Sequence, residues 1–238
     1  MLLTAGIDVQ HDRLECSVYG WGVGRECWGI EHRILYGRPD DPRTWQQLDA
    51  VLQRQHSMPN GVNVAVACAC VDSGDGTYTT NVYQYTKARE RMRVFSVKGR
   101  GGIGVPFINT PTKSNAMKAT LFTLGVDSGK SLVMNRLSVQ EPGPNFAHYA
   151  AQEDRGFSEN FFKQLTAEVL EKHFEKGVSK MAWKKIRERN EALDCAVYAT
   201  AALELLSPNF EYLAEFYALK QQTAPRRPRG TLSKGITL

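Results

Sequence analysis

The chain has 238 residues, of which 42% are hydrophobic and 23% charged, and its formal net charge is +5. This length can bury a large core, and the composition is that of a globular protein rather than a disordered or collagen-like one. No stretch approaches the ~18 apolar residues of a membrane helix, and the first residues lack the basic and apolar regions of a signal peptide. We therefore expect a cytoplasmic protein with no membrane partner.

The cysteines and the uneven charge give two further expectations. The five cysteines lack the Cys-x-x-Cys pairs of a zinc site, so we expect buried, reduced thiols. Five basic residues and no acidic ones lie between Lys220 and Leu238, which leaves the first 219 residues electrically balanced. Residues 209–238 are expected to form a helix and a mobile basic tail. That tail either contacts phosphates or an acidic partner, or is simply solvated.

The first 36 residues predict three consecutive strands. These are residues 4–9, Arg13 to Gly22 and Glu26 to Tyr36, and the turns between them are short. Strands joined in this way form an antiparallel meander. The first strand also carries Asp8 inside the apolar run TAGIDV. A buried carboxylate needs a partner, a hydrogen-bond network or a metal, because desolvating it alone is very costly.

Helices and strands then alternate. Asp41-Pro42 begins a helix that ends before Pro59. Asn63 to Asp72 (NVAVACACVD) is a nearly continuous apolar run, as expected of a central strand covered on both faces. The following elements are expected to be a helix at 78–92, a strand from Val94 to Lys98, a glycine-rich segment from Gly99 to Gly104, a strand at 120–126 and a helix at 127–137.

The last hundred residues predict helices around one hairpin. Residues 140–160 are rich in loop residues, and the segment from Phe161 to Arg189 is expected to hold a short helix and a strand pair around Gly177. Asn190 to Leu206 carries the strongest helical pattern, with an apolar stripe, and another helix is expected from about 209 to 221. The order of elements predicts one α/β domain over residues 1–208, on a mixed sheet with an antiparallel three-strand opening and parallel strands, flanked by helices.

Three carboxylates interrupt hydrophobic contexts in this scheme. Asp8 lies in the first strand, Asp72 ends the long apolar strand, and Asp194 lies inside the apolar helix. If those two strands are neighbours and the helix packs on them, the three carboxylates meet and repel each other. Divalent cations with oxygen ligands would relieve that repulsion, and two ions about 4 Å apart can clamp a phosphodiester. Taken singly, each aspartate could instead cap a turn or pair with a basic residue.

Five segments resemble the nuclease domain of lambda-type phage terminase large subunits, which has the ribonuclease-H-like fold. They read TAGIDVQHDRLECSVYGWG, VDSGDGTYTTNVYQY, VFSVKG, GVDSGK and RNEALDCAVYATAA, and the last is the most specific. The resemblance implies a metal-dependent endonuclease that cuts concatemeric double-stranded viral DNA during packaging. It implies that Asp8, Asp72 and Asp194 bind two Mg²⁺ or Mn²⁺ ions, with 5′-phosphate and 3′-hydroxyl products.

The same resemblance implies protein partners. They would be an ATPase motor domain, a small terminase subunit and a portal, all acting in the cytoplasm of the host cell. In that family the motor precedes the nuclease. This chain begins almost directly at the first nuclease strand, so we do not expect the motor's ATP chemistry here.

Two phosphate-binding patterns are incomplete. GVDSGKS, from Gly125 to Ser131, has three residues between its first glycine and the Gly-Lys pair, where a P-loop has four. DSGDGT, from Asp72 to Thr77, is similar to a phosphate hairpin of the actin and sugar-kinase superfamily. That superfamily needs a glycine where Gln10 stands, and it needs a second copy of the domain. Nucleotide binding is therefore not expected.

Further residues could support a DNA-cutting site. Glu191 lies one helical turn before Asp194 and could be an accessory ligand or base, or a solvated surface residue. Lys98 and Arg100 border the glycine-rich segment, where a DNA backbone could approach closely; a surface lysine and a flexible connector are the alternatives. A basic cluster ahead of Asn190 could contact phosphates or form a solvated face, and it contains Lys180, Lys184, Lys185, Arg187 and Arg189.

Two other functions agree with the same residues. A transposase or junction resolvase would share the fold and cut branched or transposon-end DNA in preference to plain duplex. A non-catalytic module would keep a vestigial acidic site and dock DNA or another packaging protein through the basic tail.

Overall fold

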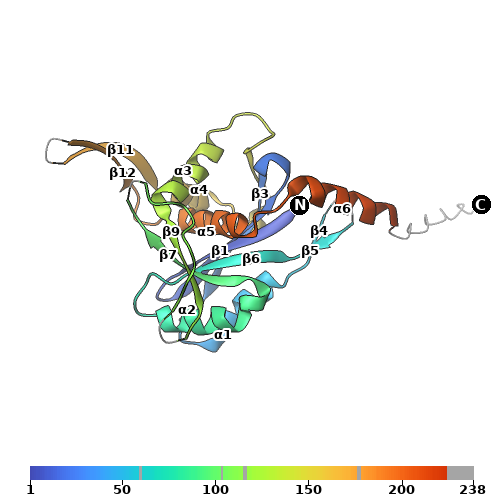
Figure 1. Ribbon diagram of the computed structural model, residues 1–238, viewed down its shortest axis with the longest axis horizontal. Coiled ribbons are helices and arrows are strands. Elements are labelled where there is room, and N and C mark those ends of the chain that lie inside the picture. Colours follow the sequence, from blue (N-terminus) through green and yellow to red (C-terminus); the bar gives the residue numbers. More distant parts are fainter. Residues whose placement is uncertain (59–60, 103, 115–116, 176–177, 224–238) are drawn as a thin grey trace, which may run out of the picture.

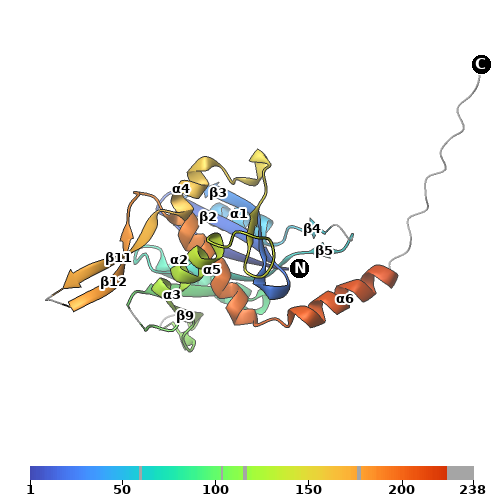
Figure 2. The same cartoon turned by 90° about the horizontal axis from the view of Figure 1, so that it is seen from above.

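The computed structural model describes residues 1–58, 61–102, 104–114, 117–175 and 178–223. Its centre is an eight-stranded mixed sheet with helices on both faces (Figures 1 and 2). This is the predicted α/β architecture of the ribonuclease-H-like type. In spatial order the strands are β10 (Ala147–Tyr149), β3 (Cys27–Tyr36), β2 (Arg13–Trp21), β1 (Leu2–Val9), β6 (Val66–Asp72), β7 (Val94–Arg100), β9 (Thr120–Gly125) and β8 (Thr112–Lys113).

The sheet has an antiparallel half and a parallel half. Strands β3, β2 and β1 form the predicted meander, and η1 (Val23–Arg25) occupies the turn between β2 and β3. Strands β1, β6, β7 and β9 run parallel to one another. Because parallel strands end at the same edge, the carboxyl ends of all four strands lie together. Asp8 and Asp72 lie at that edge.

Two groups of helices cover the sheet. Helices α1 (Pro42–Leu52) and α2 (Thr79–Arg89) lie on one face, and α3 (Val126–Leu137), α4 (Glu159–Leu165) and α5 (Glu191–Leu206) on the other (Figure 1). The hairpin of β11 (Glu168–Glu175) and β12 (Val178–Lys185) projects from one end of the molecule. Helix α6 (Phe210–Thr223) extends from the other end (Figure 2).

Several predicted boundaries are wrong, for local reasons. The predicted strand from Asn63 to Asp72 is broken, because β5 (Asn63–Val64) pairs back with β4 (His56–Ser57) before β6 begins. The predicted helix 78–92 ends at Arg89 and continues as the 3-10 turn η2 (Glu90–Met92), after which Arg93 takes a left-handed conformation. Strand β7 continues past Lys98 to Arg100, because it pairs with β9.

Short elements also occur in predicted loops. Strand β10 and the 3-10 turn η3 (Glu153–Arg155) lie in the loop-rich segment 140–160, and β8 pairs with β9. The predicted hairpin is confirmed, but its expected centre at Gly177 lies outside the described residues. The predicted basic tail lies outside them from residue 224 onward. The five cysteines are free and buried, as expected. Among the described residues, no helix is long and apolar enough to cross a membrane.

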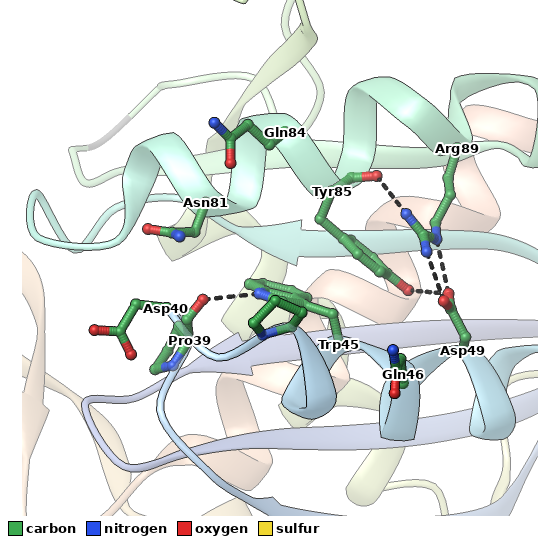
Figure 3. Close-up of a pocket in the computed structure, with 10 residues that line it drawn as sticks. Pro39, Asp40, Trp45, Gln46, Asp49, Asn81, Gln84, Tyr85 and Arg89 are labelled. Atoms are coloured by element: carbon green, nitrogen blue, oxygen red, sulfur yellow. Dashed lines mark hydrogen bonds and ion pairs between the residues drawn. The ribbon is translucent and has the colours of Figure 1, made fainter.

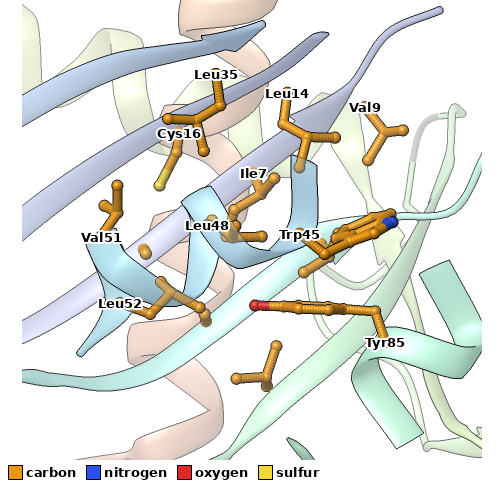
Figure 4. Packing of buried hydrophobic residues seen from close by; sticks show 14 of the residues in the cluster. Ile7, Val9, Leu14, Cys16, Leu35, Trp45, Leu48, Val51, Leu52 and Tyr85 are labelled. Carbon is orange, nitrogen blue, oxygen red and sulfur yellow. The ribbon is translucent and has the colours of Figure 1, made fainter. Parts of the chain in front are cut away.

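Strand β1 is buried on both faces, and each face packs against a different helix. Leu3, Ala5, Ile7 and Val9 pack into the core beneath α1, together with Leu14 of β2 (Figure 4). The residues between them point to the opposite face, toward α5. That alternation explains the apolar run of the sequence and directs the one carboxylate of β1 toward the helix.

An aromatic and charged cluster joins α1 to α2. Trp45 stacks on Tyr85 with ring centroids 4.5 Å apart, and the Tyr85 hydroxyl donates to Asp49 at 2.9 Å. Arg89 donates to the same carboxylate and lies over the Tyr85 ring (Figure 3). A cavity of about 380 Å³ lies beside this cluster. Its lining residues include none of the predicted site residues, so we assign the cluster to stability.

The Glu90 carboxylate anchors the start of β9. It accepts the Thr120 backbone N–H at 2.6 Å and the Thr120 hydroxyl at 2.9 Å, and Lys87 lies 3.2 Å away. Partial burial opposes ionisation, but these hydrogen bonds prevail and lower the pKa of Glu90 to about 2. A lowered pKa stabilises the fold above the unfolded value of 4.5, and that contribution is lost as the pH falls toward 2.

Replacing this carboxylate by an amide should therefore have a pH-dependent effect. We expect Glu90→Gln to lower the free energy of unfolding by about 1–2 kcal/mol at pH 7, and by clearly less at pH 3. Urea unfolding at both pH values measures the difference. Glu159→Gln removes a charge from an exposed ion pair with Lys163 and should change stability little at either pH. An equal loss for Glu90→Gln at both pH values would contradict the assignment.

Candidate metal centre

Two of the three predicted carboxylates stand on adjacent parallel strands. Asp8 follows Gly6 on the α5 face of β1, and its side chain is 5% exposed. Asp72 is the last residue of β6 and, by alternation from Val71 in the α1-side core, also faces α5. Since β1 pairs with β6 in parallel, both carboxylates lie at the same edge of the sheet.

Helix α5 rests directly on β1, which brings in the third carboxylate. A Cβ atom on Gly6 would lie 1.9 Å from the carbonyl oxygen of Cys195 and 2.5 Å from the backbone nitrogen of Ala199. The Thr4 hydroxyl also donates to the Ala199 carbonyl at 2.8 Å. Asp194 precedes Cys195 in the first turn of α5, so this close crossing places it beside Asp8.

The protonation of Asp8 and Asp72 reflects this proximity. Burial raises the pKa of Asp8 well above its usual range, the charges of Asp194 and Asp72 raise it further, and the Gln10 amide opposes them from 2.5 Å. Burial also raises the pKa of Asp72, against hydrogen bonds from the Gly74 N–H and the Tyr198 hydroxyl. Asp8, Asp72 and Asp194 therefore lie close together, with too little positive charge beside them to compensate their negative charges.

Asp194 has an additional set of neighbours. Burial raises its pKa to about 7; Lys130 opposes this rise, while the charges of Glu168 and Asp72 add to it. Its Oδ2 accepts the side-chain amide of Asn190 at 2.9 Å, and the same amide donates to Glu168 Oε1 at 3.0 Å. Lys130 Nζ donates to Glu168 Oε2 at 2.7 Å. Neither Glu168 nor Lys130 was predicted from the sequence to lie at this site.

Oxygen-only ligands on rigid elements suit Mg²⁺ or Mn²⁺, so the donor set at this edge fits the ions expected from the sequence. Burial and the charges of three carboxylates, Asp194, Asp72 and Glu191, raise the pKa of Asp8, as expected where negative charges gather without a compensating cation. Among the described residues, no three His, Cys, Asp or Glu side chains already stand close enough to hold an ion.

Glu191 is buried, and its charge is paired. Arg13 bridges Glu191 and Glu15, donating to each at 2.7 Å, and Arg189 also donates to both carboxylates. Glu15 is fully buried, so the two arginines supply the partners that its burial requires. The alternative of a solvated surface residue is excluded for Glu191 by its 7% exposure. Its role as an accessory ligand stays a prediction.

Lys98 and Arg100, which were predicted to contact DNA beside the glycine-rich segment, lie at the same edge of the sheet as the aspartates but are exposed to solvent. Val97 packs in the α5-side core, and Ser96 bonds to Thr86 of α2 at 2.6 Å. Alternation therefore directs Lys98 to the α2 face, away from the three aspartates. Arg100 ends β7 and is exposed. Contacts of Lys98 and Arg100 with DNA stay predictions.

The predicted basic cluster runs along β12 from Lys180 to Lys185 at the root of the hairpin and continues to Arg189, just before α5. Lys185 is exposed and donates to the Asn190 side-chain oxygen at 2.8 Å, so it reaches the carboxylate site. Lys184, one residue further out along β12, pairs with Glu171 at 3.2 Å. Arg187 donates to the Thr166 carbonyl. Of these three predicted DNA-binding residues, Lys185 alone contacts a neighbour of Asp194.

Comparison with known proteins identifies relatives. The family model of the terminase large subunit gpA endonuclease domain matches residues 1–214. The chain is 37% identical to the terminase large subunit of Escherichia phage lambda over 207 residues, which are 85% of this chain and 32% of that protein. It is 33% identical to the terminase large subunit of Enterobacteria phage P21 over 231 residues, 95% of this chain and 36% of that protein. No solved structure matches the chain significantly.

The family match extends over most of the chain and includes every predicted site residue. The chain spans about a third of the length of the curated relatives. The similarity inferred from short motifs is thereby confirmed over residues 1–214. The chain belongs to the family of terminase large subunit gpA endonuclease domains.

Proposed function

We propose that the chain is a Mg²⁺- or Mn²⁺-dependent endonuclease domain that cuts concatemeric double-stranded DNA during phage genome packaging. The observation that carries this proposal is the arrangement of Asp8, Asp72 and Asp194. They come from two adjacent strands and one helix, at one edge of the sheet, and each has a raised pKa. The endonuclease family and the two related phage terminase large subunits support DNA as the substrate.

In this proposal, the aspartates would bind metal ions and a lysine would contact the DNA. Asp8, Asp72 and Asp194, whose charges act on one another, would hold the ions. Two ions in such a site activate a water and stabilise the leaving oxygen of the phosphodiester. Lys185, exposed at the root of the hairpin and hydrogen-bonded to Asn190, would contact a DNA phosphate near the cut.

The partners follow from the family and are part of the proposal. An ATPase motor domain, a small terminase subunit and a portal would act together with this domain on DNA. The match to the terminase gpA endonuclease family over residues 1–214 favours this role over the transposase and resolvase alternative. The raised pKa values of three clustered carboxylates argue against a vestigial site, since repulsion without a function would be destabilising.

Plasmid nicking tests the proposal. We expect the chain to convert supercoiled DNA to open circles with Mn²⁺ or Mg²⁺ and to be inactive with EDTA. Asp8→Ala, Asp72→Ala and Asp194→Ala should each abolish nicking. Duplex DNA should be cut at least as well as branched DNA. Cleavage that persists in all three variants would remove these aspartates from the mechanism, and a folded wild type that is inactive with both metals would favour the docking module.

A further inference from the structure

The side chain at the start of α5 does not perform the task that its type and position suggest. Asn is among the best helix N-cap residues because its side-chain oxygen accepts a backbone N–H of the first turn. Asn209 does this for α6, accepting the Tyr212 N–H at 2.9 Å, and Ser158 does it for α4. Asn190 occupies the N-cap position of α5 and makes no such hydrogen bond.

The Asn190 side chain is instead fully engaged at the carboxylate site. Its Nδ2 donates to Asp194 Oδ2 at 2.9 Å and to Glu168 Oε1 at 3.0 Å, and its Oδ1 accepts Lys185 Nζ at 2.8 Å. Both donor hydrogens and the acceptor oxygen are thus used, and they join Asp194 to both strands of the hairpin.

The second carboxylate in this network is itself held firmly. Glu168 is 7% exposed, and its other oxygen accepts Lys130 Nζ at 2.7 Å, with the Lys130 side chain 13% exposed. Glu168 and Lys185 lie directly opposite each other in the hairpin register. The amide of Asn190 is therefore fixed from β11, from β12 and, through Lys130, from α3. Its direction is set before any ligand binds.

We propose that Asn190 is a positioning residue of the candidate metal centre, which holds the Asp194 carboxylate by one oxygen and leaves the other free for a cation. This inference rests on the proposed function. A hydrogen bond from a fixed donor restricts the rotation of a carboxylate, so less freedom is lost when a cation binds. Partners of this kind that orient metal ligands typically change metal affinity about 10- to 100-fold when removed.

Serine separates positioning from helix capping, because it caps helices as well as asparagine but has no amide to donate to Asp194. We expect Asn190→Ser to keep a melting temperature within about 2 °C of the wild type. Its Mn²⁺ dissociation constant, measured without DNA by the electron paramagnetic resonance of free Mn²⁺, should rise about 10- to 100-fold. In plasmid nicking, the half-saturating Mn²⁺ concentration should rise similarly, and saturating Mn²⁺ should restore most of the rate.

Two further variants complete the test. Asn209→Ser makes the same substitution at a helix cap away from the site and should leave Mn²⁺ affinity unchanged. Asp8→Ala should lose Mn²⁺ binding, which reports on the centre itself. If the wild type binds Mn²⁺, Asp8→Ala does not and Asn190→Ser binds like the wild type, the positioning role is wrong and the centre stands. A large fall in melting temperature without a change in affinity would show a structural role only. If the wild type and Asp8→Ala bind Mn²⁺ alike, the centre and its positioning residue are both wrong.

Discussion

The Asp8→Asn variant is expected to lose DNA cleavage by roughly 10³-fold or more, and its metal-free fold is expected to become more stable. The substitution preserves the size of the side chain and removes one negative charge. Asp8 is 5% exposed, and the negative charges of Asp194, Asp72 and Glu191 repel its own charge and raise its pKa. Without a cation the carboxylate destabilises the fold, whereas a two-metal centre depends on it as a ligand.

A gain in stability together with a loss of cleavage distinguishes the loss of a metal ligand from general damage to the fold. We expect the free energy of unfolding in EDTA to rise by about 1–2 kcal/mol, since burying an unpaired charge is unfavourable. Nicking rates with Mn²⁺ give the activity, and urea unfolding gives the stability. Asp154→Asn changes a carboxylate that is 76% exposed and should alter neither quantity. If Asp8→Asn cleaves DNA at the wild-type rate, Asp8 is not a ligand; if it is less stable in EDTA, the description of the metal-free site is wrong.

Gly6→Ala is expected to destabilise the protein by about 3 kcal/mol or more. The added methyl carbon would lie 1.9 Å from the Cys195 carbonyl oxygen and 2.5 Å from the Ala199 nitrogen. Both are backbone atoms of α5, so no side-chain rotation relieves the overlap, and the helix must move away from β1. Overpacking of a core commonly costs about 1–3 kcal/mol, and a clash with backbone lies at the upper end.

Gly76→Ala provides the matched comparison. A methyl group on Gly76 would have no atom within 4 Å, and the backbone conformation of Gly76 suits an L-residue. We expect its stability to stay within about 1 kcal/mol of the wild type. Urea or thermal unfolding of both variants measures the contrast. If Gly6→Ala unfolds at the wild-type midpoint, α5 does not rest on β1 in the way described, and the placement of Asp194 beside Asp8 loses its basis.

The long elements could be predicted from the sequence because their patterns are strong. The apolar alternation of the first 36 residues and the apolar stripe of α5 define the meander and the helix nearly to the residue. Strands β8 and β10 could not be predicted. They have two and three residues, and pairing with β9 and β3 creates them rather than any periodicity of their own. The break before β6 likewise arises from the pairing of Asn63 with Ser57.

The site could be predicted only in part, for a related reason. A carboxylate inside an apolar strand or helix is visible in the sequence, and this is how Asp8, Asp72 and Asp194 were found. Glu168 and Lys130 carry no such sign, because their pairing joins positions 38 residues apart. The orientation of Lys98 away from the aspartates follows only once the structure shows that Val97 packs on the α5 side and Ser96 on the α2 side.

The candidate centre stands on β1, β6 and α5, which are buried through most of their length. Backbone amides in such elements open only when the whole domain unfolds, so hydrogen exchange at Ile7, Val71 and Val197 should be among the slowest in the chain. A nuclease built on these elements cannot be switched off by disordering its ligands while the rest stays folded. Under the proposed function, control of cutting would fall to the supply of metal and to whatever brings DNA to this edge of the sheet.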